Sequence, residues 1–388
     1  MYFNLNQTQL SIIDSVQNIM KNFDDDYWLQ CDKENKFPHK FYEEIASGGW
    51  LGICMPKQFG GTALGVSDAS IFMQKVSETG GGMAAASSIH INIFGPHPIV
   101  VYGNNEQKEK WLPPLISGKE KTCFGVTEPD AGLDTGKLKT FAKKINDGYL
   151  VNGQKIWTST AKIADKILLL ARTIPVEECK KNTDGLTLFY TELDRKKIEV
   201  KEISKMGRAA VDSNQIFIDN LEVPDFDRIG EEGKGFKYIL DSLNPERILI
   251  AAEALGIGKN ALSRAVKYAS DRIVFDRPIG KNQSIQHPLA ENWIELEAAE
   301  LLIAKAAYQY DNGQNAGGMA NAAKFFAAEA GFKAATQAVI TLGGMGYAKE
   351  YHVERLLRES LIPKLAPVSA QMILNYISER VLGLPKSY

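Results

Sequence analysis

The residues that could bind a metal ion or act as thiol nucleophiles are few and far apart in this sequence. Its four cysteines are Cys31, Cys54, Cys123 and Cys179, and none of them forms a CxxC pair. This usage fits neither a zinc site nor a disulfide framework, and it suits a reducing cytosol. The five histidines show no i,i+4 pairing, so a histidine-built metal centre has little support. The sequence therefore predicts no metal site and a cytoplasmic location.

Two charged segments could do chemistry or could simply stabilise helix ends. Asn244-Pro245-Glu246 is typical of a helix start, with Asn244 as the N-cap, Pro245 in the first turn and Glu246 as a partner of the helix dipole. Arg272 lies at a predicted helix end, where a cation is favourable. Its guanidinium is also suited to a diphosphate, because it can make two parallel charge-assisted bonds.

The glycine-rich segment Gly343-Gly344-Met345-Gly346 looks like a phosphate-binding loop. It follows a predicted helix and not a strand, which rules out a dinucleotide-binding fingerprint of the Rossmann type. The segment is better explained as the end of that helix, where glycines would let a nucleotide approach.

Length and composition limit the classes of protein that this chain can represent. Its 388 residues favour two or three domains, and 44% hydrophobic with 24% charged residues predicts a folded globular chain. The 45 basic and 47 acidic residues give a net charge of -2, so no nucleic acid partner is expected. No apolar run approaches a membrane span and the first residues lack a signal pattern, so no membrane partner is expected either.

Hydrophobic periodicity predicts three regions along the chain. Helices are expected over 7–23, 38–49, 68–79, 83–94 and 106–116, and short strands over 149–157, 167–172, 186–191, 198–201 and 215–218. Asn152-Gly153 is predicted to form a hairpin turn within an antiparallel sheet. Long helices return over 246–272, 287–311, 318–342, 351–361 and 369–383.

Small residues in two of these helices have two explanations. The runs 83–86 and 251–254 are rich in alanine, which would suit either a deep substrate slot or close helix packing. Glu253, within the second run, is expected to face solvent.

Five segments occur in the order and at the spacing typical of acyl-CoA dehydrogenases. They are Val126-Thr-Glu-Pro-Asp-Ala-Gly132, Gly153-Gln-Lys-Ile-Trp157-Thr-Ser159, Arg272-Ile-Val-Phe275, Gly343-Gly-Met-Gly-Tyr347 and Glu354-Arg355. The chain resembles this family over nearly its whole length. The resemblance implies an α+β fold with a helical domain (1–121), a central antiparallel β domain (122–232) and a C-terminal four-helix bundle (233–388).

The resemblance also implies FAD as cofactor. Cofactor-binding residues are expected at Phe124, Val126, Thr127, Trp157, Ser159, Arg272, Phe275, Gln283, Gly343, Gly344, Ser369 and Gln371. In such enzymes, positions matching Trp157 and Ser159 cover the flavin N5 side, and Arg272 and Gln283 match residues that reach the FAD of a neighbouring subunit.

The resemblance offers one position for the catalytic base. Pro367 stands where many family members carry the base on a loop. A second branch, including isovaleryl- and long-chain acyl-CoA dehydrogenases, carries a glutamate on a bundle helix, and Glu246 matches it, with Arg247 and Asn244 near the substrate. Pro367 also lacks an amide that helps to polarise the thioester, so either the Val368 amide replaces it, or the alignment is off by one residue, or activation differs. Leu133 and Ile340 replace a usual serine and glutamine.

The implied activity is conversion of an acyl-CoA to a trans-2-enoyl-CoA in fatty or branched acyl metabolism. The implied partners are electron-transfer flavoprotein and three further copies of the chain in a homotetramer, a dimer of dimers. Alternatives are a flavin-dependent monooxygenase, an acyl-CoA oxidase or a non-enzymatic flavoprotein scaffold.

Overall fold

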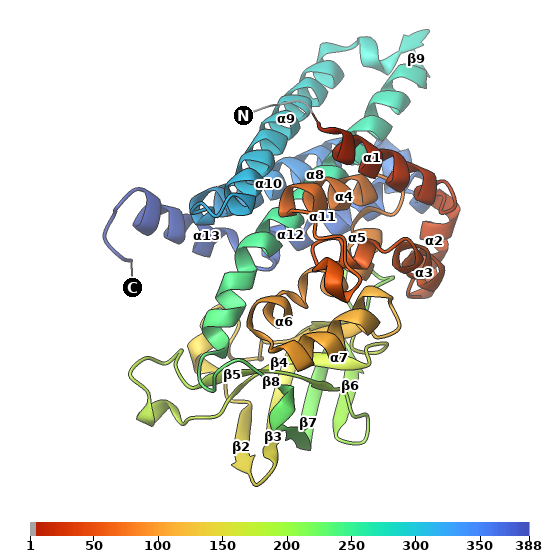
Figure 1. The fold of residues 1–388 in the computed structure, drawn as a ribbon. Coiled ribbons are helices and arrows are strands. Elements are labelled where there is room, and N and C mark those ends of the chain that lie inside the picture. Colours follow the sequence, from red (N-terminus) through yellow and green to blue (C-terminus); the bar gives the residue numbers. More distant parts are fainter. Residues whose placement is uncertain (1–4, 388) are drawn as a thin grey trace.

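The computed structural model describes residues 5–387 and begins with a helical region (Figure 1). Its helices are α1 (Gln7–Met20), α2 (Asp25–Glu34), α3 (His39–Ser47), α4 (Val66–Ser77), α5 (Gly82–Phe94), α6 (His97–Tyr102) and α7 (Asn105–Ile116). An asparagine caps α1 and another caps α7, each in a capping box. The predicted helices are all present, and α2 and α6 are additional to the prediction.

The central region is an eight-stranded sheet. Its strands are β1 (Thr122–Gly125), β2 (Phe141–Ile145), β3 (Gly148–Ser159), β4 (Lys166–Arg172), β5 (Leu186–Glu192), β6 (Ile198–Glu202), β7 (Ser213–Pro224) and β8 (Arg228–Ile229). The order is β6-β7-β3-β2-β4-β5-β8, with β1 beside β4. Most pairs are antiparallel as predicted, but β1 and β2 each pair with β4 in parallel. The sheet is therefore mixed.

The predicted hairpin at Asn152-Gly153 is wrong. Both residues lie inside the continuous strand β3, at a shift in its pairing with β7. Gly153 has φ +152°, and a Cβ there would lie 2.5 Å from Thr140 Oγ1. The glycine is needed because another segment approaches closely, and the actual β2–β3 turn follows Ile145.

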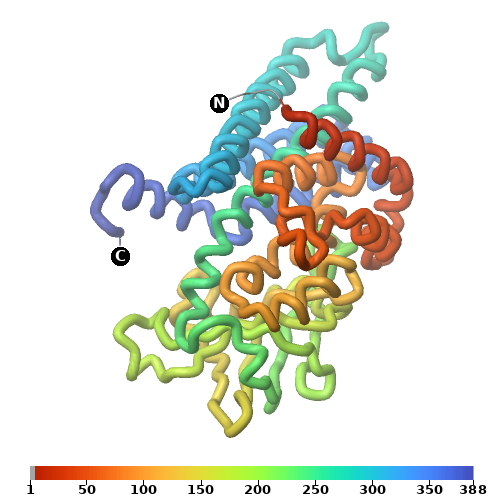
Figure 2. Tube along the Cα trace, in the orientation of Figure 1, coloured from red at the N-terminus to blue at the C-terminus, as the bar shows by residue number. Residues whose placement is uncertain are grey.

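The C-terminal region is helical. It contains α8 (Gly235–Asp271), α9 (Gln283–Asp311), α10 (Gly317–Leu342), α11 (Val353–Ser360), α12 (Ile362–Leu365) and α13 (Ala370–Tyr376). The short strands β9 (Ile273–Val274) and β10 (Arg277–Pro278) join α8 to α9. The tube trace shows α8 leaving the sheet and running through the helical part to this distant hairpin (Figure 2). The predicted boundaries at 121 and 232 stay predictions.

The helix start expected at Asn244 is also wrong. α8 begins at Gly235, so Pro245 and Glu246 lie in its interior. Proline cannot donate the backbone hydrogen bond of its turn, yet the helix continues for another 26 residues, to Asp271. Glu246 is thus not a dipole partner in a first turn. Gly343, by contrast, does end its helix, as the C-cap of α10 with φ +60°.

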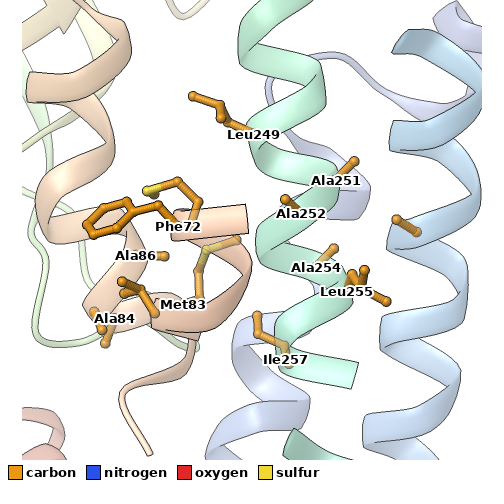
Figure 3. Packing of buried hydrophobic residues seen from close by; sticks show 14 of the residues in the cluster. Phe72, Met83, Ala84, Ala86, Leu249, Ala251, Ala252, Ala254, Leu255 and Ile257 are labelled. Carbon is orange, nitrogen blue, oxygen red and sulfur yellow. The ribbon is translucent and has the colours of Figure 1, made fainter. Parts of the chain in front are cut away.

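The alanine-rich helices pack closely in one core. Figure 3 shows Met83, Ala84 and Ala86 of α5 beside alanines of α8. On the other side of α8, a Cβ at Gly331 of α10 would lie 2.5 Å from the carbonyl of Ala254. None of these alanines lines the cavity described below. The small residues therefore serve close helix packing.

Candidate active site

A cavity of about 430 Å³ lies where α5 and α8 meet the ends of β1 and β3. α8 contributes one stripe of residues spaced three and four apart, as expected for one face of a helix: Phe236, Ile239, Leu240, Leu243, Glu246, Arg247 and Ile250. The strand ends contribute Phe124, Val126, Thr127, Ile156, Trp157 and Ser159, and α5 contributes Ser87, His90 and Ile91. Residues within 362–372 close another part of the wall, and the lining is completed by Gly132, Leu133, Thr135 and Arg208.

A buried ion pair fixes the turn that presents Thr127 to the cavity. Lys155 of β3 donates from Nζ to the Val126 carbonyl at 3.1 Å and to Glu128 Oε1 at 2.9 Å. Glu128 also accepts the backbone N–H groups of Lys139 and Thr140, at 2.7 and 2.9 Å. Burial would raise the pKa of Glu128, but these donors hold it below its ordinary value. The glutamate of this turn is thus a structural anchor.

Trp157 is held in an unusual backbone conformation. The pairing of β3 with β7 shifts by one residue between Lys155 and Thr158, and Trp157 lies in this bulge with φ +62°. A bulge redirects a side chain, and a positive φ is costly for a bulky residue. The indole is 57% exposed although it lines the cavity. An exposed aromatic face held under strain is suited to stacking on a planar ligand.

Glu246 is the carboxylate of the cavity. Its Oε2 is buried without a hydrogen-bond partner among residues 5–387. Burial raises the pKa of Glu246 from 4.5 to about 7, while the cations of His90, Arg247 and Lys324 oppose this shift. A carboxylate with this pKa can accept a proton near neutral pH.

Arg247 and the segment around Pro367 complete the wall near Glu246. Arg247 lines the cavity and donates from Nη1 to Asn244 Oδ1 at 3.1 Å, so Asn244 orients the guanidinium from behind. Pro367 and Val368 also line the cavity, and Lys324 Nζ donates to the Val368 carbonyl at 2.6 Å. The backbone that precedes α13 is thereby tied to α10.

The predicted cofactor residues fall into two groups. Phe124, Val126, Thr127, Trp157 and Ser159 meet at the cavity, whereas Arg272, Phe275, Gln283, Gly343, Gly344, Ser369 and Gln371 do not line it. The α8–α9 hairpin, which carries the first three of the second group, lies far from the sheet (Figure 1). Phe275 is 93% exposed. The space around Gly343 and Gly344 is also open, because a Cβ added to either of them would meet no atom within 4 Å. Ser369 caps α13.

Four polar residues of this region were missed by sequence reasoning. Glu253 does not face solvent as predicted, because its carboxylate is buried and paired with His90 Nδ1 at 2.6 Å. Burial would lower the pKa of His90, but Glu253 raises it above its ordinary value. Ser87 and Arg208 also line the cavity. The only sequence signal is the i,i+3 spacing of Ser87 and His90 on one helix face.

The described residues contain neither a metal-binding cluster nor a membrane-spanning helix. Between residues 5 and 387, no three His, Cys, Asp or Glu side chains are grouped to hold a metal ion. No helix in this range has the length and apolar character needed to cross a membrane.

Comparisons with known proteins agree with this architecture. Family models match the acyl-CoA dehydrogenase N-terminal domain at residues 6–119, the middle domain at 123–221 and the C-terminal domain at 233–382. Acyl-CoA dehydrogenase fadE12 of Mycobacterium bovis is 33% identical over 96% of both chains. The caffeyl-CoA reductase-Etf complex subunit CarC of Acetobacterium woodii is 33% identical over 91% of this chain and 92% of its own. Butyryl-CoA dehydrogenase from Megasphaera elsdenii superposes with a TM-score of 0.93 at 30% identity, covering 98% of this chain and 100% of that one.

The fold and the cavity define a flavoprotein oxidoreductase. The chain belongs to the acyl-CoA dehydrogenase family, whose cofactor is FAD. The residues present fit that cofactor: the strained, exposed indole of Trp157 offers a stacking face, and the Thr127 and Ser159 hydroxyls line the same cavity. Thr127, Ser159 and the strand end at Val126 would hold the isoalloxazine. When bound, the isoalloxazine supplies a two-electron acceptor.

Proposed function

We propose that this enzyme removes two hydrogens from an acyl-CoA thioester and yields a trans-2-enoyl-CoA, with Glu246 as the base. The observation that carries this proposal is the unpaired, buried Oε2 of Glu246 in the cavity that Trp157 also lines. Glu246 takes the α-proton on its carboxylate, and a double bond forms between the α- and β-carbons as the β-hydrogen leaves with its electron pair. FAD, when bound, would supply the acceptor for that hydride. The apolar stripe of α8 excludes water, so the carboxylate stays poorly solvated and basic.

Arg247 and the protein backbone support the substrate in this proposal. Arg247, oriented by Asn244, lies next to the base and would face the CoA thioester side. The backbone of Val368, held by Lys324, is the candidate replacement for the amide that Pro367 lacks. Both roles are positioning roles, because a thioester is dehydrogenated only when its α-carbon lies within reach of the base.

Electron transfer and assembly follow from the same proposal. The Etf complex of the Acetobacterium woodii relative supports electron-transfer flavoprotein as the acceptor. Several apolar side chains are exposed in and after the α8–α9 hairpin, among them Phe275, Trp293 and Ile294. These exposed side chains support a homotetramer. In this assembly, Arg272, Phe275 and Gln283 would contact the FAD of a neighbouring copy. Sedimentation equilibrium showing a monomer at micromolar concentration would contradict this assembly.

The first test is reduction of the bound flavin by substrate. The purified holoenzyme, mixed without oxygen with neutral and acidic acyl-CoAs of four to sixteen carbons, should lose its visible absorbance with at least one of them. Bleaching by none of them would overturn the proposal. Air admitted to the reduced enzyme distinguishes the alternatives, because fast oxygen consumption would indicate an oxidase or monooxygenase.

The pH dependence of the reductive step is the second test. Because the base must be ionised, kcat/KM should rise about tenfold per pH unit below pH 7 and become constant above it. Stopped-flow flavin reduction between pH 5.5 and 8.5 measures this dependence. A flat profile over that range would mean that Glu246 does not control the proton transfer.

A further inference from the structure

Arg208 is a cation in the cavity with neutral partners only. It lies between β6 and β7 and lines the cavity. Its Nη atoms donate to Ser213 Oγ at 2.8 Å, Ser159 Oγ at 3.0 Å and Ser87 Oγ at 3.4 Å. Its Nε is buried without a hydrogen-bond partner in the described part of the chain. A guanidinium is seldom buried in a protein without an anion.

The acidic side chains nearest to Arg208 are bonded to other groups. Asp212, Glu359 and Glu253 act on the guanidinium only through space. Glu253 is paired with His90 at 2.6 Å, Glu359 accepts the backbone N–H groups of Met83 and Ala84, and Asp212 accepts the backbone N–H of Lys162. Burial lowers the pKa of Arg208 despite these acids, so an additional anion would stabilise the cation.

The unpaired cation shares its cavity with the base. Glu246 of α8 and Arg208 line the same space, and Ser87 and His90, one turn apart on α5, line it too. His90 Nε2 is a second buried polar atom without a partner among residues 5–387. A purely apolar acyl group would leave both nitrogen atoms unsatisfied, which is costly for buried groups. A second acceptor group on the substrate would satisfy them.

We propose that Arg208, together with Ser87 and His90, binds a carboxylate carried by the acyl group of the substrate. The preferred substrates are then monothioesters of dicarboxylic acids. This inference rests on the proposed function and names the substrate class of the same cavity. The carboxylate would accept a charge-assisted hydrogen bond from Nε, which has no partner in the described part of the chain. The serine hydroxyls that accept from the Nη atoms pre-orient the guanidinium, so little side-chain freedom is lost on binding.

The experiment measures binding separately from turnover. Holoenzyme carrying Glu246→Gln is titrated by calorimetry with succinyl-, glutaryl- and adipyl-CoA, and with butyryl-, valeryl- and hexanoyl-CoA of equal carbon number. At least one acidic ligand should bind about 10- to 100-fold more tightly than its neutral counterpart, as expected for charge-assisted hydrogen bonds. Adding Arg208→Met should abolish this preference, while Arg208→Lys should keep part of it.

A matched control removes another arginine of the same region. Arg195 is exposed and donates to the Ala164 carbonyl at 2.8 Å, outside the cavity. Arg195→Met should leave the preference unchanged. If Arg208→Met does not retain FAD, the comparison of acidic with neutral ligands on the unsubstituted Arg208 background still decides the proposal.

Three outcomes would overturn the inference. These are equal binding of acidic and neutral ligands, a preference that persists in Arg208→Met, and a changed flavin reduction potential in Arg208→Met without any change in ligand preference. The last outcome would assign Arg208 to the cofactor, through Ser159. Reduction of wild-type flavin by neutral acyl-CoAs alone would overturn this inference only, whereas reduction by no acyl-CoA would overturn the proposed function itself.

Discussion

Glu246→Gln should leave FAD bound and slow flavin reduction by at least about two orders of magnitude. The amide has the size of the carboxylate but cannot accept the α-proton. The α8 stripe that carries residue 246 is otherwise unchanged, so acyl-CoA should still bind. Stopped-flow reduction and a binding titration on the same preparation separate the two effects. A variant that keeps more than a tenth of the wild-type rate would place the base elsewhere.

The matched control is the same substitution at Glu300. Glu300 lies on α9, outside the cavity, and pairs with Lys259 at 2.7 Å. Glu300→Gln should change the reductive rate less than about twofold, because a partly exposed ion pair contributes little even to stability.

The stability of Glu246→Gln gives an independent readout of burial. The folded-state pKa of about 7 exceeds the ordinary 4.5, so the folded protein holds this proton more tightly than the unfolded chain. Wild-type stability should therefore fall as the pH rises from 4.5 to 7, by about 2–3 kcal/mol. The amide does not ionise, so the variant does not lose stability in this way. Thermal unfolding should therefore show that the stability of the variant increases relative to that of wild type between pH 5 and pH 8.

Local periodicity predicted most of the helical framework. α1, α4, α5 and α7 carry apolar residues at helical spacing, and each was predicted within a few residues. α2 was missed because its central Tyr27, Trp28 and Leu29 are consecutive and its first turn is acidic, which hides the period. α6 is only six residues long, too short to show one.

Turn and cap signals were less reliable, because tertiary contacts override them. Asn152-Gly153 has the composition of a hairpin turn, but Thr140 packs against Gly153 in the middle of β3. Pro245 was assigned to a first turn, yet the apolar residues Phe236 and Ile239 extend α8 backwards along the cavity. In both cases the local conformation is determined by contacts that the short motif does not contain: Thr140 in the first case, and the apolar residues that line the cavity in the second.

The buried polar contacts of the site could not be predicted either, because they join residues that are far apart in the sequence. His90 and Glu253 are 163 residues apart, and charge alone assigned Glu253 to the surface. Arg208 meets its three serines from α5, β3 and β7. Thr127, Trp157 and Glu246 were predicted through the family resemblance, because five motifs occur together in the expected order, whereas each motif alone would favour a structural explanation.

The largest expected effect on stability is that of Glu128→Ala. This substitution leaves Lys155, which is 0% exposed, as a buried cation without its carboxylate, and it removes the acceptor for the Lys139 and Thr140 amides. Breaking a buried pair from one side costs about 3–5 kcal/mol. Urea unfolding of the holoenzyme should show a loss of this size, and FAD should be released more easily because the turn that presents Thr127 is no longer anchored.

Two further variants distinguish the effect of the buried ion pair on stability from that of a surface charge in the same turn. Glu128→Gln keeps an acceptor for the two amides and should lose less stability than Glu128→Ala. Asp130 pairs with Lys139 while about three quarters exposed, at 74%, so Asp130→Asn should cost less than about 1 kcal/mol. If Glu128→Ala destabilises no more than Asp130→Asn does, the buried pair does not anchor the turn, and the strained bulge at Trp157 must hold that side of the cavity by itself.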